Sequence, residues 1–105
     1  MAIYAIYDVT MLLHIVCFKY KPETDAAARR QHRERLAGLK TLDGVIDLKV
    51  GEDVLQAQRS YDTGLLITFP DRAALDAYAT NPVHVPVAQL GVSLSSHIVS
   101  VDFHI

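Results

Sequence analysis

The chain has 105 residues, of which 50% are hydrophobic, and its formal net charge at pH 7 is -2. A chain of this length holds one domain, and the near-neutral charge gives no electrostatic case for binding nucleic acid or an anionic membrane. A domain this small has too little interior to hide so many apolar side chains, so the excess predicts a subunit interface or an apolar pocket.

The first residues are apolar, yet they do not have the pattern of a signal peptide or a membrane span. No Lys or Arg precedes the apolar run, Asp8 interrupts it, and it is shorter than the roughly 20 apolar residues that a bilayer requires. We therefore expect residues 1–10 to be an extension ahead of a domain at 11–105. The single cysteine, Cys17, cannot form an intrachain disulfide, which favours a cytoplasmic location.

The first predicted strand covers residues 12–20, LLHIVCFKY, where both alternating faces are mostly apolar. This pattern is typical of a central strand that is covered on both sides. Thr24 is suited to cap a helix that runs to about Lys40. The predicted apolar stripe of this helix consists of Ala28, His32, Leu36 and Leu39.

Two further strands are predicted after this helix. Asp43-Gly44 forms a turn, and residues 45–50, VIDLKV, alternate like a half-buried strand. A polar loop then leads to a third strand at 61–69, YDTGLLITF.

The last third of the chain predicts a helix over residues 71–80, which Pro82 stops because proline disfavours helical geometry in the residue before it. A short irregular helix at 83–92 is expected next, with Asn81 as its N-cap and Pro82 at its first position. Residues 96–103 form the closing strand.

The resulting order is β-α-β-β-α-β. Two interleaved β-α-β units with right-handed crossovers give an antiparallel four-stranded sheet with both helices on one face, which is the ferredoxin-like α+β fold. The other face of the sheet would be uncovered, and its residues are also apolar. We therefore expect a second copy of the chain to cover it, so that two sheets together make a barrel.

The helix break at Pro82 has a polar side chain on either side of it, and we expect the break to bring the two together. Tyr78 lies on the inward face of the helix, and the break lets His84 fold back toward the same space. A neutral His is a competent base near pH 7, and a Tyr hydroxyl can donate a hydrogen bond to an oxyanion. Such a pair suits proton abstraction next to a carbonyl without a cofactor. The plainer interpretation is that Tyr78 packs in the core and His84 bonds nearby carbonyls.

The sequence resembles the stress-responsive A/B barrel domain (Dabb), also called the dimeric α+β barrel. The matching pieces are HIVCFKYKP at 14–22, Gly51-Glu52-Asp53-Val54, Tyr61-Asp62, AYATNPVH at 77–84 and VDF at 101–103. The resemblance implies a homodimer, in agreement with the composition.

Within this family, a plant polyketide cyclase uses a His and a Tyr as its acid/base pair. The resemblance assigns these roles to His84 and Tyr78, and it matches a pocket histidine to His14. This chain departs from the pattern in two places. The family segment His-Pro-x-His begins here with Asn81, and another pocket histidine of that enzyme corresponds to Thr63.

These observations predict a mostly apolar pocket between the sheet and the helices. The pocket residues are expected to be His14, Val16, Phe18, His32, Leu36, Leu65, Tyr78, His84 and Val87. The predicted function is binding of a small aromatic, apolar or carbonyl compound, with cofactor-free acid/base catalysis as a further hypothesis. The alternative is a structural or stress-associated dimer whose core is filled by its own side chains.

Other chemistries have little support in the sequence. The five histidines show no close pair at metal-ligand spacing, so no metal is expected. Cys17 is predicted to lie mid-strand as an inert buried thiol. No phosphate-binding loop or dinucleotide fingerprint is present, and haem handling, known in related barrels, has no specific motif here.

Overall fold

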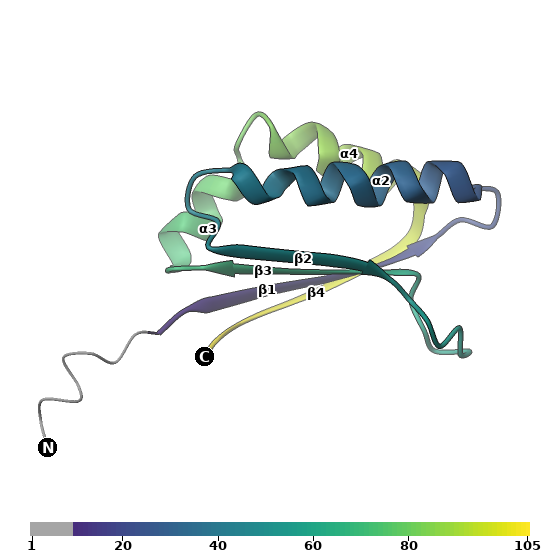
Figure 1. Ribbon diagram of the computed structural model, residues 1–105, viewed down its shortest axis with the longest axis horizontal. Helices are drawn as coiled ribbons and strands as arrows, with labels where there is room; N and C mark the ends of the chain where they lie inside the picture. Colours follow the sequence, from purple (N-terminus) through teal and green to yellow (C-terminus); the bar gives the residue numbers. More distant parts are fainter. Residues whose placement is uncertain (1–9) are drawn as a thin grey trace, which may run out of the picture.

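Four strands form one antiparallel sheet in the computed structural model, which describes residues 10–105. The elements are β1 (Leu12–Tyr20), α2 (Ala26–Gly38), the 3₁₀ turn η1 (Leu39–Thr41), β2 (Asp47–Glu52), β3 (Thr63–Phe69), α3 (Arg72–Ala79), α4 (His84–Leu94) and β4 (Ser95–His104). The strand order is β2-β3-β1-β4, and the helices lie on one face of the sheet (Figure 1). The predicted ferredoxin-like fold is confirmed. The predicted extension at 1–10 lies outside the described residues, apart from Thr10.

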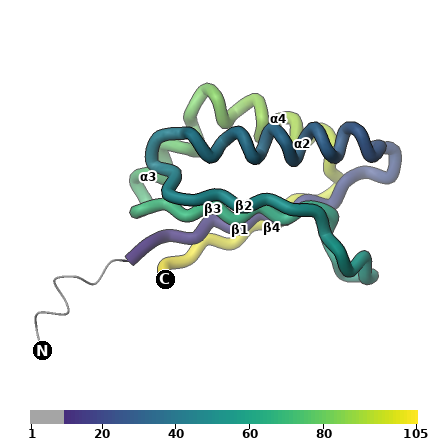
Figure 2. The backbone as a smooth tube through the Cα atoms, in the orientation of Figure 1, coloured from purple at the N-terminus to yellow at the C-terminus, as the bar shows by residue number. Residues whose placement is uncertain are grey.

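Strand β1 is the centre of the sheet, because it pairs with β3 on one side and with β4 on the other. Figure 2 shows the first and last strands of the domain running side by side. Within β1, Val16, Phe18 and Tyr20 are buried beneath the helices, whereas Ile15 and Cys17 on the opposite face are only partly covered. Both faces of β1 are therefore apolar, but in a single chain the helices cover only one of them.

Helix α2 begins one residue later than predicted. Asp25, and not Thr24, is its N-cap, with Oδ1 accepting from the Ala28 amide at 2.8 Å. The Thr24 hydroxyl instead donates to the Leu94 carbonyl at 2.8 Å and so ties the start of α2 to the end of α4. The α-helical part also ends earlier, at Gly38, and η1 replaces the predicted last turn.

The two middle strands are shifted from their predicted bounds by hydrogen bonding. The predicted start of β2 is too early, because the Val45 amide donates to the Leu42 carbonyl in a turn. The strand continues to Glu52, which pairs with Thr63 at the start of β3. The β3 boundary is later than predicted, because Asp62 is occupied in a polar cluster described below.

Helix α3 has Asp71 as its N-cap, which accepts from the Ala74 amide at 2.9 Å, and it ends at Ala79. Helix α4 is regular and reaches Leu94, whereas the sequence predicted an irregular helix at 83–92. Asn81 caps the turn ahead of α4 and not the helix itself, since its Oδ1 accepts from the Val83 amide at 2.8 Å.

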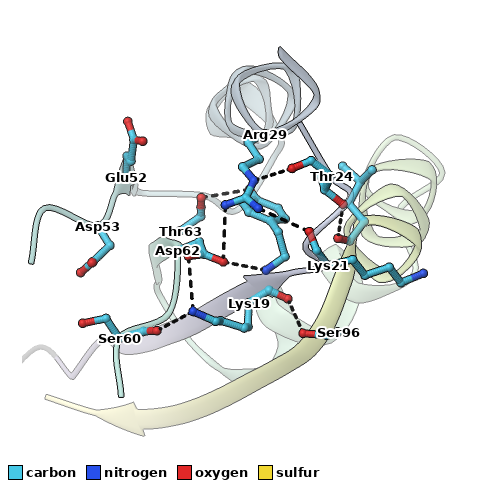
Figure 3. Close-up of polar contacts among 12 residues, drawn as sticks. Lys19, Lys21, Thr24, Arg29, Glu52, Asp53, Ser60, Asp62, Thr63 and Ser96 are labelled. Carbon is cyan, nitrogen blue, oxygen red and sulfur yellow. Dashed lines mark hydrogen bonds and ion pairs between the residues drawn. The ribbon is translucent and has the colours of Figure 1, made fainter. Parts of the chain in front are cut away.

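A polar cluster fixes the end of β1 that lies under the start of α2. The Tyr20 amide donates to Asp62 Oδ2 at 2.8 Å, and the Asp62 amide donates to the Phe18 carbonyl at 2.8 Å. Lys19 Nζ and an Arg29 guanidinium nitrogen lie 3.6 and 3.9 Å from the Asp62 carboxylate (Figure 3). Asp62 therefore joins the β2–β3 hairpin to β1 and α2.

His32 is the most deeply buried ionisable side chain of the first helix, with an exposed fraction of 0%. Its Nδ1 lies 2.7 Å from the Tyr20 hydroxyl, which is also 2.9 Å from Thr63 Oγ1. Its Nε2 has no hydrogen-bond partner among the described residues. Helix α4 approaches this imidazole closely at Gly91, where an added Cβ would lie only 3.1 Å from Nε2. His32 is thus a core residue whose neutral form suits its surroundings.

We predict that His32 makes the fold acid-sensitive. Burial, with help from the positive charges of Arg33 and Arg35, lowers the pKa of His32 from 6.5 to about 4. Between these two values the unfolded chain takes up a proton that the folded chain does not. The contribution of His32 is therefore fully present above pH 6.5 and is lost as the pH falls toward 4, by up to about 3 kcal/mol.

Urea unfolding between pH 7 and pH 4.5 measures this effect. The His32→Gln variant should show a flatter dependence of unfolding free energy on pH than wild type. The control His97→Gln replaces an exposed histidine of β4 and should keep the wild-type dependence. An unchanged slope in His32→Gln would contradict the assignment.

Candidate functional site

A cavity of about 190 Å³ lies between the helix-covered face of the sheet and helices α3 and α4. Its lining residues come from β1, α2, β3, α3, α4 and β4. They are His14, Val16, Phe18, Leu36, Leu65, Tyr78, His84, Val87, Ala88, Val92 and Ile98. Apart from three polar side chains, His14, Tyr78 and His84, the lining is apolar.

The helix break at Pro82 brings Tyr78 and His84 together. Tyr78 lies in the last turn of α3 and His84 is the first residue of α4, and their ring centroids are 4.1 Å apart at an interplanar angle of 37°. Tyr78 is only 3% exposed, and burial raises the pKa of its hydroxyl. That hydroxyl makes no hydrogen bond to any of the residues described, and it is not among the sealed unpartnered atoms. It is therefore a protonated donor that is available to the cavity.

The protein backbone fixes the tautomer of His84. Its Nδ1 lies 3.2 Å from the Ala79 carbonyl oxygen, which can only accept, so Nδ1 carries the proton of the neutral ring. Nε2 is then the unprotonated nitrogen. Burial lowers the pKa of His84, more strongly than the Ala79 hydrogen bond raises it. His84 is accordingly neutral at pH 7 and has the lone pair that a general base needs.

His14 forms a pair that sequence reasoning missed. Its Nδ1 lies 2.5 Å from Asp102 Oδ1, across the β1–β4 ladder in which these two residues are direct partners. A carboxylate beside a histidine nitrogen orients the ring and selects its tautomer. The His14 ring is edge-on to Tyr78, with centroids 6.0 Å apart. The one usable signal in the sequence was an acidic residue inside an apolar strand.

Asp102 also borders a second, more polar groove outside the cavity. This groove has a volume of about 570 Å³ and includes Arg72, Asp76 and His104 in its lining. The Asp102 side chain is 34% exposed, compared with 17% for His14. The His14–Asp102 pair therefore connects the cavity with a solvent-accessible groove.

Two residues singled out from the sequence do not line the cavity. His32 was predicted as a pocket residue, but it is sealed in the core and bonded to Tyr20. Thr63, which the family resemblance matches to a pocket histidine of one enzyme, is 1% exposed and bonded to the same Tyr20 hydroxyl. Both side chains are therefore part of the packed core beneath α2 and do not face the cavity.

Three lining residues were not predicted, namely Ala88, Val92 and Ile98. Ala88 and Val92 follow His84 at intervals of four, which places them on one face of a regular helix. The prediction of an irregular helix hid this periodicity. Ile98 enters the lining because it pairs with Phe18 on the neighbouring strand.

Within residues 10–105, no three or more His, Cys, Asp or Glu side chains are grouped so that they could hold a metal ion. Over the same range, no helix is both long and apolar enough to cross a membrane.

Comparison with known proteins identifies one matching family and a large set of related folds. The family profile described as Stress responsive A/B Barrel Domain matches residues 12–105. No curated protein matches the chain.

Among solved structures, a dimeric ferredoxin-like protein of unknown function from Jannaschia sp. CCS1 is 31% identical, with a TM-score of 0.77, and the match covers 90% of this chain and 99% of that one. A dimeric ferredoxin-like protein of unknown function from Thermobifida fusca YX is 18% identical, with a TM-score of 0.84 and coverage of 91% and 92%. A hydroxynitrile lyase from Passiflora edulis is 17% identical, with a TM-score of 0.84 and coverage of 93% and 95%.

The hydrogen bonds of the site predict which nitrogen carries the proton in each neutral ring. Both His14 and His84 should be Nδ1–H tautomers, because Asp102 Oδ1 and the Ala79 carbonyl can only accept. Long-range ¹⁵N–¹H correlation spectra of the imidazoles at pH 8 measure this directly. In Asp102→Ala, the His14 signals should shift toward the other tautomer, whereas those of His84 should not. An Nε2–H pattern for His84 in wild type would contradict its role as a base.

Proposed function

The chain belongs to the stress-responsive A/B barrel family, and we propose that it is a homodimer that binds a small aromatic, apolar or carbonyl compound in the cavity beside Tyr78 and His84. The observation that carries this proposal is the convergence of Tyr78, His84 and His14 at one part of an otherwise apolar cavity. Apolar cavities with a few converging polar groups are the usual form of a small-molecule site.

The polar groups support acid/base catalysis on a bound carbonyl compound. In this mechanism His84 Nε2 takes a proton from the carbon next to the carbonyl, and the electron pair of that C–H bond forms the enolate. The Tyr78 hydroxyl donates a hydrogen bond to the enolate oxygen as negative charge develops there. The enolate carbon then attacks a second carbonyl, and protonated His84 returns its proton to the new alkoxide. No cofactor takes part in these steps.

The His14–Asp102 pair would assist this chemistry from the side of the cavity. Asp102 accepts from His14 Nδ1 and so directs the other ring nitrogen away from the carboxylate. Because Asp102 also borders the outer groove, the pair offers a route for proton exchange between the cavity and water. Asp102 acts through His14 and is therefore a positioning residue.

The same fold occurs in a hydroxynitrile lyase, so it is compatible with an enzyme active site. At 17% identity this likeness extends to the fold alone.

The open face of the sheet supports the homodimer. On β4, Val99, Val101 and Phe103 are 48%, 54% and 43% exposed, which is unusual for apolar strand residues. Their neighbours on the same face are Leu13, Ile15, Cys17 and Leu66. A second copy packed sheet to sheet would bury this surface, and several neighbours of the same fold are described as dimeric. The proposal includes a cytoplasmic location, with neither nucleic acid nor membrane as a partner.

A second candidate function is a structural or stress-associated dimer that binds no ligand. The near-complete burial of Tyr78 and the small volume of the cavity favour it. Haem handling has less support, because a cavity of about 190 Å³ is smaller than the roughly 300–1,000 Å³ typical of larger ligands.

We expect ligands of the cavity to raise the thermal midpoint of wild type and to have no effect on Tyr78→Phe/His84→Ala. The reason is that binding to the folded state stabilises it by mass action. A thermal-shift screen with phenols, β-polyketones and aromatic acids measures this. For any compound that is also converted, His84→Ala should abolish turnover and leave the dimer intact.

The control variant Tyr61→Phe/His97→Ala makes the same chemical changes outside the cavity and should respond like wild type. If no compound shifts the wild type, or if the Tyr78/His84 variant responds equally, the ligand-binding function is wrong and the structural dimer is favoured.

Dimer formation is tested by placing a charge on the open face of the sheet. Val101→Glu would bury an unpaired carboxylate between two sheets, a cost of several kcal/mol, so sedimentation should show monomer. The matched control is Val83→Glu, since Val83 is 55% exposed and Val101 is 54% exposed, and Val83 lies between α3 and α4. That control should stay dimeric. Equal behaviour of both variants would count against a sheet-to-sheet dimer.

A further inference from the structure

We infer that the cavity selects an uncharged compound the size of one substituted ring, with a hydroxyl or carbonyl oxygen as the polar head at the Tyr78–His84 end. This inference rests on the proposed ligand-binding function and narrows its ligand class. It follows from three separate features of the cavity, which are its volume, the charges of its lining and the distribution of its polar atoms.

The volume limits the size of the ligand. The cavity measures about 190 Å³, and an engineered protein cavity of roughly 150 Å³ holds a benzene molecule. Drug-sized ligands occupy pockets of roughly 300 Å³ or more. One ring with a short substituent therefore fits, whereas two rings or a long chain would require the lining to move apart.

The charges of the lining exclude an anionic ligand. No Lys or Arg is among the lining residues of this cavity in the described part of the chain. Burial keeps His84 neutral and Tyr78 protonated, since it lowers the pKa of His84 and raises that of Tyr78. Any positive charge on His14 is matched by the Asp102 carboxylate 2.5 Å away.

Charged groups on the elements packed around the site do not change this balance. Arg72, the cation that shares a groove with Asp102, lies outside the cavity and is hydrogen-bonded to Asp76 at 2.9 Å. A carboxylate or phosphate in the cavity would thus lose its hydration without gaining a cation, which is costly. A neutral hydroxyl can instead donate to His84 Nε2 and accept from the Tyr78 hydroxyl, and a carbonyl oxygen can accept from the Tyr78 hydroxyl.

The distribution of polar atoms sets the orientation of the ligand. The Tyr78 ring lies between two histidines, with its centroid 6.0 Å from that of His14 and 4.1 Å from that of His84. The remaining lining is aliphatic or aromatic, and it includes Ile98, which pairs with Phe18 across the sheet. The polar head therefore faces the histidines, and the substituent on the ring faces the Phe18–Ile98 part of the wall. Ile98, which is 38% exposed, is the residue of this wall that a longer substituent would meet.

Calorimetric titrations at pH 7.5 with 4-ethylphenol, 4-ethylbenzoate and 4-hexylphenol test the three features together. We expect 4-ethylphenol to bind the wild-type dimer, and 4-ethylbenzoate, which is ionised, to bind at least about tenfold more weakly. The longer 4-hexylphenol should bind more weakly than 4-ethylphenol. Ala88→Leu, which fills the cavity, should lose 4-ethylphenol.

The size limit is tested by Ile98→Ala, which enlarges the cavity and should improve 4-hexylphenol binding by about tenfold, since roughly two more methylene groups of the hexyl chain can then be buried. The matched control Ile46→Ala removes the same atoms from an isoleucine that is 53% exposed and outside the cavity. It should bind all three compounds like wild type.

The outcomes separate this inference from the function on which it rests. If the compounds bind, depend on Ala88, and show no preference for short neutral ones, the inference is overturned and ligand binding stands. If 4-ethylphenol does not bind while larger or anionic compounds do, the inference is again wrong. If nothing in this set or in the thermal-shift panel binds, the inference and the binding function fail together. The expected preferences without any turnover would support the inference and remove only the catalytic role.

Discussion

The register of β1 between β3 and β4 is the constraint on which the rest of this structure depends. Side chains of a strand alternate between faces, so a slip of one residue would move every β1 side chain to the other face. In the observed register His14 faces the helices opposite Asp102, and Phe18 faces them opposite Ile98. A slipped β1 would point His14 away from the cavity and turn Cys17 and Ile15 into the core.

The two ends of β1 have different functions in this arrangement. At its C-terminal end, Tyr20 and Lys19 belong to the polar cluster around Asp62, which joins β1 to the hairpin and to α2 (Figure 3). At the other end, the His14 ring is edge-on to Tyr78, and both line the cavity together with His84. The hydrogen bonds of the first end hold the register, and the register positions the polar groups of the second end.

Burial lowers the pKa of both His32 and His84, but the two side chains have different roles. His32 is enclosed on all sides and makes folding depend on its remaining neutral. His84 is only partly buried, and the same desolvation leaves it neutral, with one nitrogen bound to Ala79 and the other available to the cavity. His32 is a core residue because its second ring nitrogen faces packed atoms. His84 is a candidate base because its second ring nitrogen faces the cavity.

The sequence by itself determined the fold class, the approximate position of every strand and helix, and the pairing of Tyr78 with His84. These features depend on periodicity and on Pro82, which are local properties of the chain. The boundaries of α2, β2 and β3 were wrong by one or two residues because capping and turn hydrogen bonds, such as those of Asp25 and Asp62, compete with propensity at element ends.

Only the tertiary structure decided which side chains meet across strands. The His14–Asp102 pair joins residues that are 88 positions apart, and Ile98 enters the cavity through its pairing with Phe18. The environment of His32 could not be predicted from the sequence either. Its place on the apolar stripe of a helix predicts that the side chain points inward, but not whether it contacts a cavity or a tyrosine hydroxyl. These contacts depend on the register between distant strands and on the packing of helices, and neither can be derived from local sequence patterns alone.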